Sequence, residues 1–307
     1  MGKEQKSRYL ISIVGPTAVG KTSTAIYLAK MLGTEIISAD SRQFFREMSI
    51  GTAKPTPEEL RQVRHHFVDS LSVEDDYNAG KFERDALSTI ERLFASYSTL
   101  VMVGGSGLYC RAVWEGLDEM PAVKDGVREG LNQMFERYGL EPLWKELSEK
   151  DPDYFDQVDR ANHQRVIRAL EVIRSTGLPF SKFRGNSTRK VRSFYNIKIG
   201  LSLDRQELYS RIDQRMDQMI KQGLFEEAKR LYPYRNNYAL QTVGYQEIFP
   251  FFTGEYDHEE AVRLLKRNSR RYAKRQLTWY KKDQEIQWFS PGNPDLIVAF
   301  VKSKLDT

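Results

Sequence analysis

The chain has 307 residues, enough for one large domain or two, and 40% of them are hydrophobic, which is sufficient for a buried core. No apolar run approaches the roughly 18 residues of a membrane-spanning helix, and the polar start of the chain is not a secretory signal. The single cysteine, Cys110, excludes an internal disulfide and a cysteine-rich zinc site. These features favour the cytoplasm. The net charge of +5 is mild and does not by itself indicate nucleic acid binding.

The first part of the chain alternates predicted strands and helices. Residues 9–14 (YLISIV) form an apolar, branched run typical of a strand buried on both faces of a parallel sheet. The turn GPTAVG leads into a helix, KTSTAIYLAKML, that Gly33 closes. A second strand is predicted in TEIISAD, followed by a helix over 79–96 and a third strand over 99–105. This order predicts a doubly wound parallel α/β sheet.

The pattern changes after residue 118. Between 119 and 189 the sequence predicts helices, in VREGLNQMFERYG, LEPLWKELSEK and NHQRVIRALEVIRSTG, the last ending at Gly177. We interpret 119–189 as a helical insertion domain, and SKFRGNSTRKVRSF at its end as a mobile loop. A strand over 195–203, a helix over 205–222, further helices and a short strand in EIQWF follow. The core domain is therefore expected to comprise 1–118 and 190–307.

Residues 15–22, GPTAVGKT, match the phosphate-binding pattern G-x-x-x-x-G-K-[ST] without a gap. Gly15 and Gly20 permit a backbone geometry in which amide N–H groups converge on one anion, and the positive end of the next helix points to the same place. Lys21 adds a cationic contact, and the Thr22 hydroxyl is placed to bind Mg²⁺. The strand before and the helix after predict a P-loop NTPase-like core. The expected loop residues are Gly15, Pro16, Thr17, Ala18, Val19, Gly20, Lys21 and Thr22.

The motif alone leaves the phosphate compound open. An ATPase normally has a second carboxylate at the end of a neighbouring apolar strand, but the strand 99–105 continues into GGSGLY, which carries no acid. The second strand does end at an acid, Asp40. Asp40 could bind Mg²⁺ in an ATPase or kinase, act as a base beside the phosphates, or be an ordinary surface aspartate.

Seven segments occur in the order seen in tRNA dimethylallyltransferases, which add an isopentenyl group to adenine: GPTAVGKT, ISADSRQ, IGTAKPTPEE, VGGSGLY, NHQRVIRALEV, TVGYQE and AKRQLTWYKK. The resemblance extends from about residue 10 to 288, and IGTAKP, VGYQE and KRQLTW are its most specific part. It implies that the phosphates belong to dimethylallyl diphosphate, that Mg²⁺ is the cofactor, and that the acceptor is N6 of adenosine 37, beside the anticodon of tRNA.

The resemblance also implies roles for individual residues. Asp40 would be the general base that removes a proton from the attacking amine, and Arg215 would clamp the diphosphate, helped by Arg211 one turn away. Ser106 stands where the family commonly has threonine in a G-G-T motif, and would bind the reacting amine or the diphosphate. Thr22 would hold the metal. A small-molecule or nucleoside kinase, an adenylate isopentenyltransferase acting on free AMP, and a non-catalytic RNA-binding protein are the alternatives.

The clearest candidate for RNA binding is the segment 263–282, which is rich in Lys and Arg, lacks acids, and interleaves Tyr272, Trp279 and Tyr280. An amphipathic helix with a solvated charged face explains the composition equally well, and the resemblance favours RNA. We expect the protein to be a monomer. The four histidines are not spaced as metal ligands on one helix face would be. The implied tRNA-binding residues are Asp40, Ser41, Arg42, Gln43, Ser106, Arg128, Gln164, Arg165, Val166, Ile167, Arg168, Gln241, Thr242, Val243, Gly244, Tyr245, Gln246, Lys274, Arg275, Gln276, Trp279 and Lys281.

Overall fold

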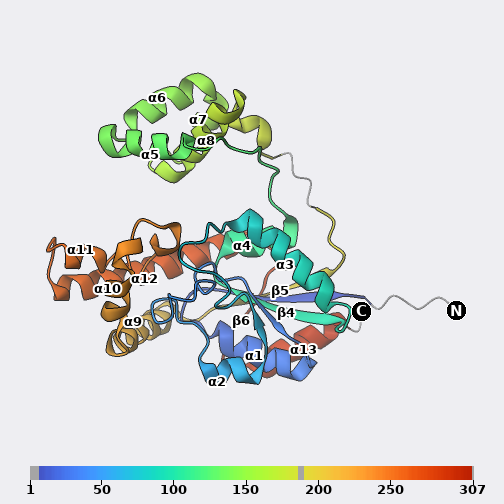
Figure 1. Cartoon of the computed structure of the whole chain (residues 1–307). Helices are drawn as coiled ribbons and strands as arrows, with labels where there is room; N and C mark the ends of the chain where they lie inside the picture. The colour runs from blue at the N-terminus through green and yellow to red at the C-terminus, as the bar shows by residue number, and fades with distance from the viewer. Residues whose placement is uncertain (1–6, 186–189, 306–307) are drawn as a thin grey trace. The chain divides into compact units, whose positions relative to one another are not determined.

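The computed structural model describes residues 7–185 and 190–305 and divides into two compact units (Figure 1). The core unit comprises Met1–Trp114 and Arg192–Thr307 and contains the sheet. The second unit, Glu115–Val191, is helical. The insertion expected over 119–189 falls within this second unit.

The core unit is built on a six-stranded sheet with the order β3-β2-β4-β1-β5-β6, and every neighbouring pair is parallel. The predicted doubly wound parallel sheet is therefore confirmed. Its central strands are almost wholly buried, because helices cover both faces of a parallel sheet. The edge strand β3 was not predicted, since two histidines are too short to show a periodicity. The strands are β1 (Tyr9–Val14), β2 (Ile36–Ser38), β3 (His65–His66), β4 (Thr99–Gly104), β5 (Tyr195–Leu201) and β6 (Gln287–Phe289).

Helices α1 and α13 lie on one face of the sheet, and α3 and α4 lie on the other (Figure 1). Helix α1 ends where predicted, because Gly33 adopts the left-handed conformation and closes it. Thr56 and Glu59 form a reciprocal capping box that begins α2. Helix α13 was not among the predicted elements. The helices of the core are α1 (Lys21–Leu32), α2 (Pro57–Gln62), α3 (Ala79–Leu93), α4 (Gly107–Glu115), α9 (Arg205–Lys221), α10 (Leu224–Leu231), α11 (Phe249–Phe252), α12 (His258–Tyr280) and α13 (Pro294–Leu305).

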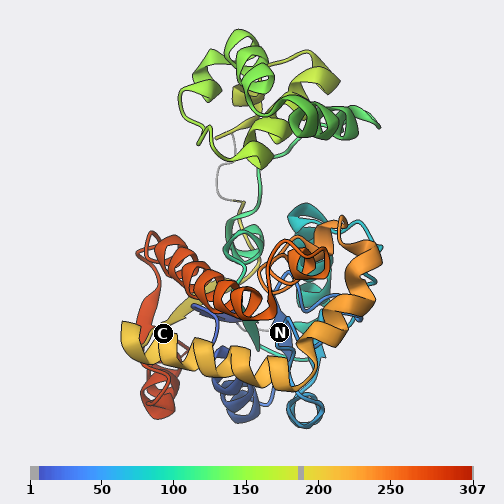
Figure 2. The ribbon, with the colours of Figure 1, turned by 90° about the vertical axis from the view of Figure 1, so that its left-hand side faces the viewer.

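The basic segment folds as the long helix α12, which packs beside α9 (Figure 2). Its buried residues recur every three or four positions and form one stripe: Ala261, Leu265, Ser269, Ala273, Gln276 and Tyr280. Two of its cations bind acids of α9, since Lys266 lies 2.7 Å from Asp217 and Arg270 lies 2.5 Å from Asp213. Part of the positive charge therefore serves helix packing, whereas Arg263, Arg271, Lys274 and Arg275 are exposed.

The helical unit has its own apolar core, formed by α5, α6 and α8 around Leu131, Leu143 and Leu170. Helix α8 begins after the N-cap Asn162 and ends at Gly177, as predicted. The expected mobile loop is wrong at its start, where Phe180–Phe183 form a short 3₁₀ helix; residues 186–189 of this loop lie outside the described residues. The helices are α5 (Val127–Tyr138), α6 (Glu141–Lys150), α7 (Pro152–Phe155) and α8 (His163–Thr176).

A membrane-spanning helix would need a long apolar run. Within residues 7–185 and 190–305, no helix combines the necessary length and apolarity.

Candidate active site

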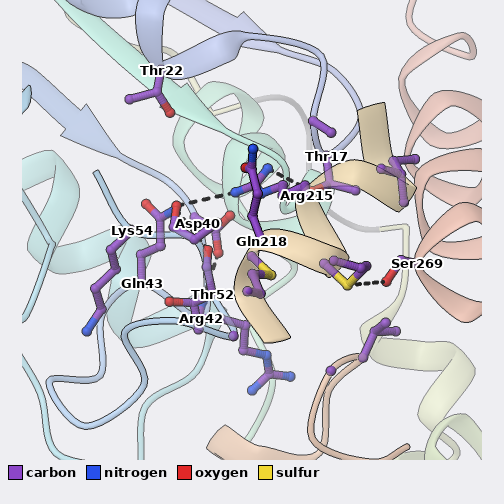
Figure 3. Close-up of a pocket in the computed structure, with 18 of the residues that line it drawn as sticks. Thr17, Thr22, Asp40, Arg42, Gln43, Thr52, Lys54, Arg215, Gln218 and Ser269 are labelled. Carbon is purple, nitrogen blue, oxygen red and sulfur yellow. Dashed lines mark hydrogen bonds between the residues drawn. The ribbon is translucent and has the colours of Figure 1, made fainter. Parts of the chain in front are cut away.

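One cavity of about 580 Å³ lies where the loops after β1 and β2 meet α9 and α12 (Figure 3). The phosphate loop contributes Lys21 and Thr22, the end of β2 contributes Asp40, and α9 contributes Arg215. Because the carboxyl ends of parallel strands lie at one edge of the sheet, a topology of this kind gathers such side chains at one place. The structure thus brings together residues that the sequence separates by almost two hundred positions.

The phosphate loop has the positive-φ backbone geometry that its two glycines permit. Gly15, Ala18 and Gly20 all have positive φ, at 147°, 64° and 105°. A Cβ atom at Gly15 would lie 2.6 Å from the carbonyl oxygen of Leu201, so only glycine fits there. The ammonium of Lys21 donates a hydrogen bond to the Pro16 carbonyl over 2.7 Å, which holds the side chain across the loop.

Lys21 and Arg215 place positive charge at the cavity. Burial lowers the pKa of Lys21 to about 8, although the negative charge of Asp40 opposes this shift. Burial also lowers the pKa of Arg215, again against the effect of Asp40. The guanidinium of Arg215 donates hydrogen bonds to the Thr17 hydroxyl (3.3 Å) and to the Ala53 carbonyl (3.4 Å). Two cations and one carboxylate at a phosphate loop make a site suited to an anion with more than one charge.

Asp40 is held by the backbone that follows it. The N–H of Arg42 donates to Oδ1 of Asp40 over 3.0 Å, so one carboxylate oxygen is fixed by an Asx turn. Among the described residues no donor is found for Oδ2. Asp40 is therefore an oriented carboxylate that lines the cavity with an oxygen free to accept a proton.

Ser106, at the turn after β4, is oriented through Ser41. The Ser41 N–H donates to the Ser106 hydroxyl, and this hydroxyl donates to Oγ of Ser41, each over 3.0 Å. The phenol of Tyr272 from α12 lines the same cavity. Burial, together with the negative charge of Asp40, raises the pKa of Tyr272 to about 12. Tyr272 therefore presents a protonated hydroxyl, a role that the sequence did not suggest.

The predicted residues Arg42 and Gln43 face inward. The Arg42 guanidinium donates to the carbonyls of Tyr238 (2.7 Å), Ala239 (3.1 Å) and Gln241 (3.3 Å), and it lies 4.7 Å from the Tyr238 ring centroid. The Gln43 amide donates to the carbonyl of Ala53 over 3.1 Å. Both side chains thus hold loops in place around the cavity that they line, and their contact with RNA stays a prediction.

Four other residues predicted to contact RNA have buried side chains: Val166, Ile167, Tyr245 and Gln276. Val166 and Ile167 belong to the apolar core of the helical unit, because they lie on the inner face of α8. Their contribution is therefore to packing. The predicted loop residues Thr242, Val243 and Gly244 line the cavity, whereas Gln241 and Gln246 are exposed and hydrogen-bonded to each other over 2.8 Å.

The remaining predicted RNA contacts form two groups, one on each unit. In the core unit, Lys274, Arg275 and Trp279 of α12 and Lys281, which directly follows the helix, are exposed. In the helical unit, Arg128 and Arg168 bind the buried carboxylate of Glu171, at 3.2 Å and 2.7 Å, and Arg128 also donates to Gln164 over 3.1 Å. Arg165 is exposed beside them. Glu171 orients this cluster and was not predicted.

Other functional residues escaped sequence reasoning because their role depends on burial. Glu227 of α10 accepts hydrogen bonds from the N–H groups of Ser49, Ile50 and Gly51, each within 3.0 Å, and from the hydroxyl of Tyr245. In the sequence Glu226 and Glu227 look equivalent, yet Glu226 is exposed to solvent and Glu227 is only 2% exposed. Arg211, predicted to assist Arg215, lines the cavity and binds Glu207 at 2.9 Å.

The residues at the cavity fit a magnesium ion bound with phosphate. Mg²⁺ prefers oxygen ligands and usually takes one or two from protein and the rest from phosphates and water. The Thr22 hydroxyl and the Asp40 carboxylate are oxygen ligands of this kind, and both line the cavity. In the described ranges there is no group of three or more His, Cys, Asp or Glu that could form an all-protein metal cage.

Comparison with known proteins gives one consistent result. The family model described as IPP transferase matches residues 43–283. The chain is 52% identical to the tRNA dimethylallyltransferase of Cytophaga hutchinsonii, over 97% of this chain and 98% of that protein, and 50% identical to that of Christiangramia forsetii, over 98% and 100%.

Solved structures agree. The full-length tRNA isopentenylpyrophosphate transferase of Bacillus halodurans is 38% identical, with a TM-score of 0.72 over 98% of this chain and 97% of that one. A eukaryotic dimethylallyltransferase, whose structures are described as snapshots of the enzyme acting on tRNA, is 26% identical, with a TM-score of 0.75 over 89% of this chain and 70% of that one. Together with the phosphate loop and the carboxylate beside it, these matches establish that the chain belongs to the IPP transferase family.

Proposed function

We propose that this protein transfers the dimethylallyl group of dimethylallyl diphosphate to N6 of adenosine 37 in tRNA and releases diphosphate. The observation that supports this most directly is the placement of the Asp40 carboxylate at one cavity with the phosphate loop, Lys21 and Arg215. An allylic diphosphate ionises readily, so such a site must stabilise the departing anion and supply a base to the nucleophile. The relatives are named tRNA dimethylallyltransferases, which supports transfer of this group to tRNA.

The departing diphosphate would be stabilised by groups that are already oriented. Lys21 is tied to the Pro16 carbonyl and Arg215 to the Thr17 hydroxyl, so neither cation has to reorganise as negative charge develops. When bound through Thr22 and phosphate oxygens, Mg²⁺ would supply further charge neutralisation. Met216, Met219 and Val243 line the same cavity and suit the apolar prenyl chain. Such a wall also limits the access of water to an allylic cation.

The amine would lose its proton to Asp40. The exocyclic N6 of adenine is a poor nucleophile, and it acquires positive charge as the new C–N bond forms. The Arg42 N–H fixes Oδ1 of Asp40, which leaves Oδ2 to take the proton. The Ser106 hydroxyl, oriented by Ser41, is a neutral group able to bind the amine or the diphosphate. The sum of these steps exchanges one C–O bond for one C–N bond and releases one proton.

RNA binding would involve both units. Chemistry on a base requires that the base leave the stack, and loops of RNA are the usual targets of such recognition. The exposed cations of α12 and the arginine cluster of the helical unit suit contacts with phosphates of an anticodon stem-loop. We place the reaction in the cytoplasm, where tRNA is found, and in a monomer, since a single chain supplies every proposed catalytic residue.

The decisive experiment is to incubate the protein with Mg²⁺, dimethylallyl diphosphate and an unmodified tRNA, and to analyse the nucleosides by mass spectrometry. We expect adenosine to gain one dimethylallyl group, and a tRNA with guanosine at position 37 to remain unmodified. Parallel reactions contain AMP as acceptor, or ATP as donor. Prenylation of AMP in preference to tRNA, or phosphate transfer from ATP without prenylation, would replace the proposal by one of the alternatives.

A further inference from the structure

Helix α12 contacts the phosphate loop through one buried side chain. The carboxamide oxygen of Gln276 accepts a hydrogen bond from the backbone N–H of Thr17 over 2.8 Å. The carboxamide nitrogen of the same residue donates to the carbonyl of Gly105 over 2.9 Å. Gln276 is 7% exposed, so both bonds are shielded from water. One side chain therefore joins the loop after β1 to the turn after β4.

The turn after β4 is rich in glycine because α12 packs directly against it. A Cβ atom at Gly105 would lie 2.4 Å from the Gln276 carboxamide nitrogen. A Cβ atom at Gly107 would lie 2.3 Å from the indole of Trp279, one turn further along α12. Any other residue at either position would require a shift of the helix or the turn. The glycines thus serve the approach of α12, whereas the glycines of the phosphate loop serve its backbone geometry.

The two segments that Gln276 joins carry the proposed chemistry. Thr17 belongs to the phosphate loop and its hydroxyl accepts a hydrogen bond from Arg215. Gly105 directly precedes Ser106, and a Cβ atom added to Gly105 would lie 3.6 Å from the Lys21 ammonium. The Gln276 carboxamide therefore links the phosphate loop to the turn that carries Ser106. The basic segment 263–282 was predicted to bind RNA, but Gln276 within it faces the phosphate loop and the turn after β4.

We propose that Gln276 is a positioning residue for the diphosphate site, which sets the phosphate loop at its working distance from the Ser106 turn. This inference rests on the proposed function. According to this inference, Gln276 does not contact RNA. It instead contributes to the affinity of the protein for dimethylallyl diphosphate. The prediction is specific: removal of the carboxamide should affect the donor and leave the RNA affinity unchanged.

The test uses inorganic pyrophosphate with Mg²⁺, measured by titration calorimetry on the full chain. Gln276→Met keeps the length of the side chain and removes both hydrogen bonds, so we expect the pyrophosphate affinity to fall about tenfold or more. In steady-state assays the KM for dimethylallyl diphosphate should rise, and the KM for tRNA should stay within about twofold of the wild-type value. The matched control is Gln284→Ala, an exposed glutamine in the turn after α12.

A double-mutant cycle tests the interaction itself. Gly105→Ala introduces a methyl group where the Gln276 carboxamide lies, so it should weaken pyrophosphate binding in the wild-type background. In the Gln276→Met background its additional effect should be smaller, because the hydrogen bond to Gly105 is already absent. The control is Gly130→Ala, where an added methyl meets no atom within 4 Å. If Gln276 only filled space beneath α12, its replacement would not affect donor binding more than RNA binding.

The outcomes separate the two proposals. If the wild-type protein does not bind pyrophosphate, the proposed function fails and this inference fails with it. If the wild type binds pyrophosphate and Gln276→Met binds it equally well, only the inference is overturned. A fall in the RNA affinity of Gln276→Met with unchanged pyrophosphate affinity would also overturn the inference. It would favour the direct contact between Gln276 and RNA that the sequence predicted. If Gln276→Met does not fold, the pyrophosphate affinity of Gly105→Ala is compared with that of Gly130→Ala. Equal affinities of these two variants would overturn the inference.

Discussion

The hydroxyl of Tyr245 donates a hydrogen bond to the carboxylate of Glu227 over 2.7 Å, and both side chains are buried. The same carboxylate accepts three backbone N–H groups from residues 49–51. A Cβ atom at Gly51 would lie 2.7 Å from the Tyr245 ring, so this loop approaches the ring as closely as glycine permits. The loop 49–51 and the loop 242–246, both at the cavity, are thus held by one buried charge.

Glu227→Gln should destabilise the fold. A neutral amide cannot accept all four hydrogen bonds with the strength of a carboxylate, and its NH₂ group would face other donors. We expect a loss of about 3 kcal/mol in the free energy of unfolding, measured by urea denaturation. The control is Glu226→Gln on the same helix, whose side chain is more accessible. Equal stability of the two variants would contradict the assignment.

Asp40→Asn should lower turnover with little effect on RNA affinity. Asparagine keeps an oxygen for the Arg42 N–H but cannot take a proton from the amine. We expect the single-turnover rate to fall about a hundredfold or more, the scale of general-base removal. Asp40→Ala should do at least the same. The rate is measured with saturating tRNA and donor, and RNA affinity is measured separately by filter binding. Comparable rates for Asp40→Asn and the wild type would rule out Asp40 as the base.

Binding of pyrophosphate should weaken as the pH rises through about 8. Burial lowers the pKa of Lys21 to about 8, so its ammonium is charged below this pH and neutral above it, and only the charged form attracts the anion. Bound pyrophosphate favours the charged form and moves the midpoint upward. Calorimetry from about neutral pH to about two pH units above the pKa compares the wild type with Lys21→Met, so that the ionisation of pyrophosphate itself cancels. A ratio of affinities that does not change with pH would refute the role of Lys21.

Arg42→Lys should loosen the loop that the guanidinium holds. Lysine cannot reach three carbonyl groups in the fork geometry of arginine, so the segment 238–246 should open more often. Hydrogen exchange followed by mass spectrometry should show faster exchange in peptides of this segment. Arg46→Lys, an exposed position a few residues away, is the control. Unchanged exchange together with weaker RNA binding would instead favour the direct RNA contact predicted from the sequence.

Replacement of Lys274 and Arg275 by alanine should weaken tRNA binding and flatten its salt dependence. Removal of one phosphate contact lowers the slope of log K against log salt by about one, so we expect a decrease of about two. The control is Lys302→Ala with Lys304→Ala, which removes the same charge from exposed positions on α13. If both double variants bind tRNA with the same salt slope, the outer face of α12 is not part of the RNA surface.

Local patterns predict most of the elements. The strands β1 and β4 and the helix α1 lie at nearly their predicted bounds, because a buried parallel strand is a continuous apolar run and Gly33 ends the helix by its own conformation. The phosphate loop is predictable for the same reason, since its backbone geometry is specified by neighbouring residues. By contrast, β3 and α13 were missed. β3 consists of two residues whose strand geometry comes entirely from pairing with β2.

The sequence by itself determined the α/β class, the phosphate loop and the carboxylate that follows β2, because these depend on residues close together in the chain. Only the tertiary structure decided which polar side chains face inward. Gln276 lies next to the exposed Arg275 but binds Thr17, 259 positions away, and Glu227 is buried beside the more accessible Glu226. A polar side chain has the same character in either place, and its role is set by partners that distant segments bring to it on folding.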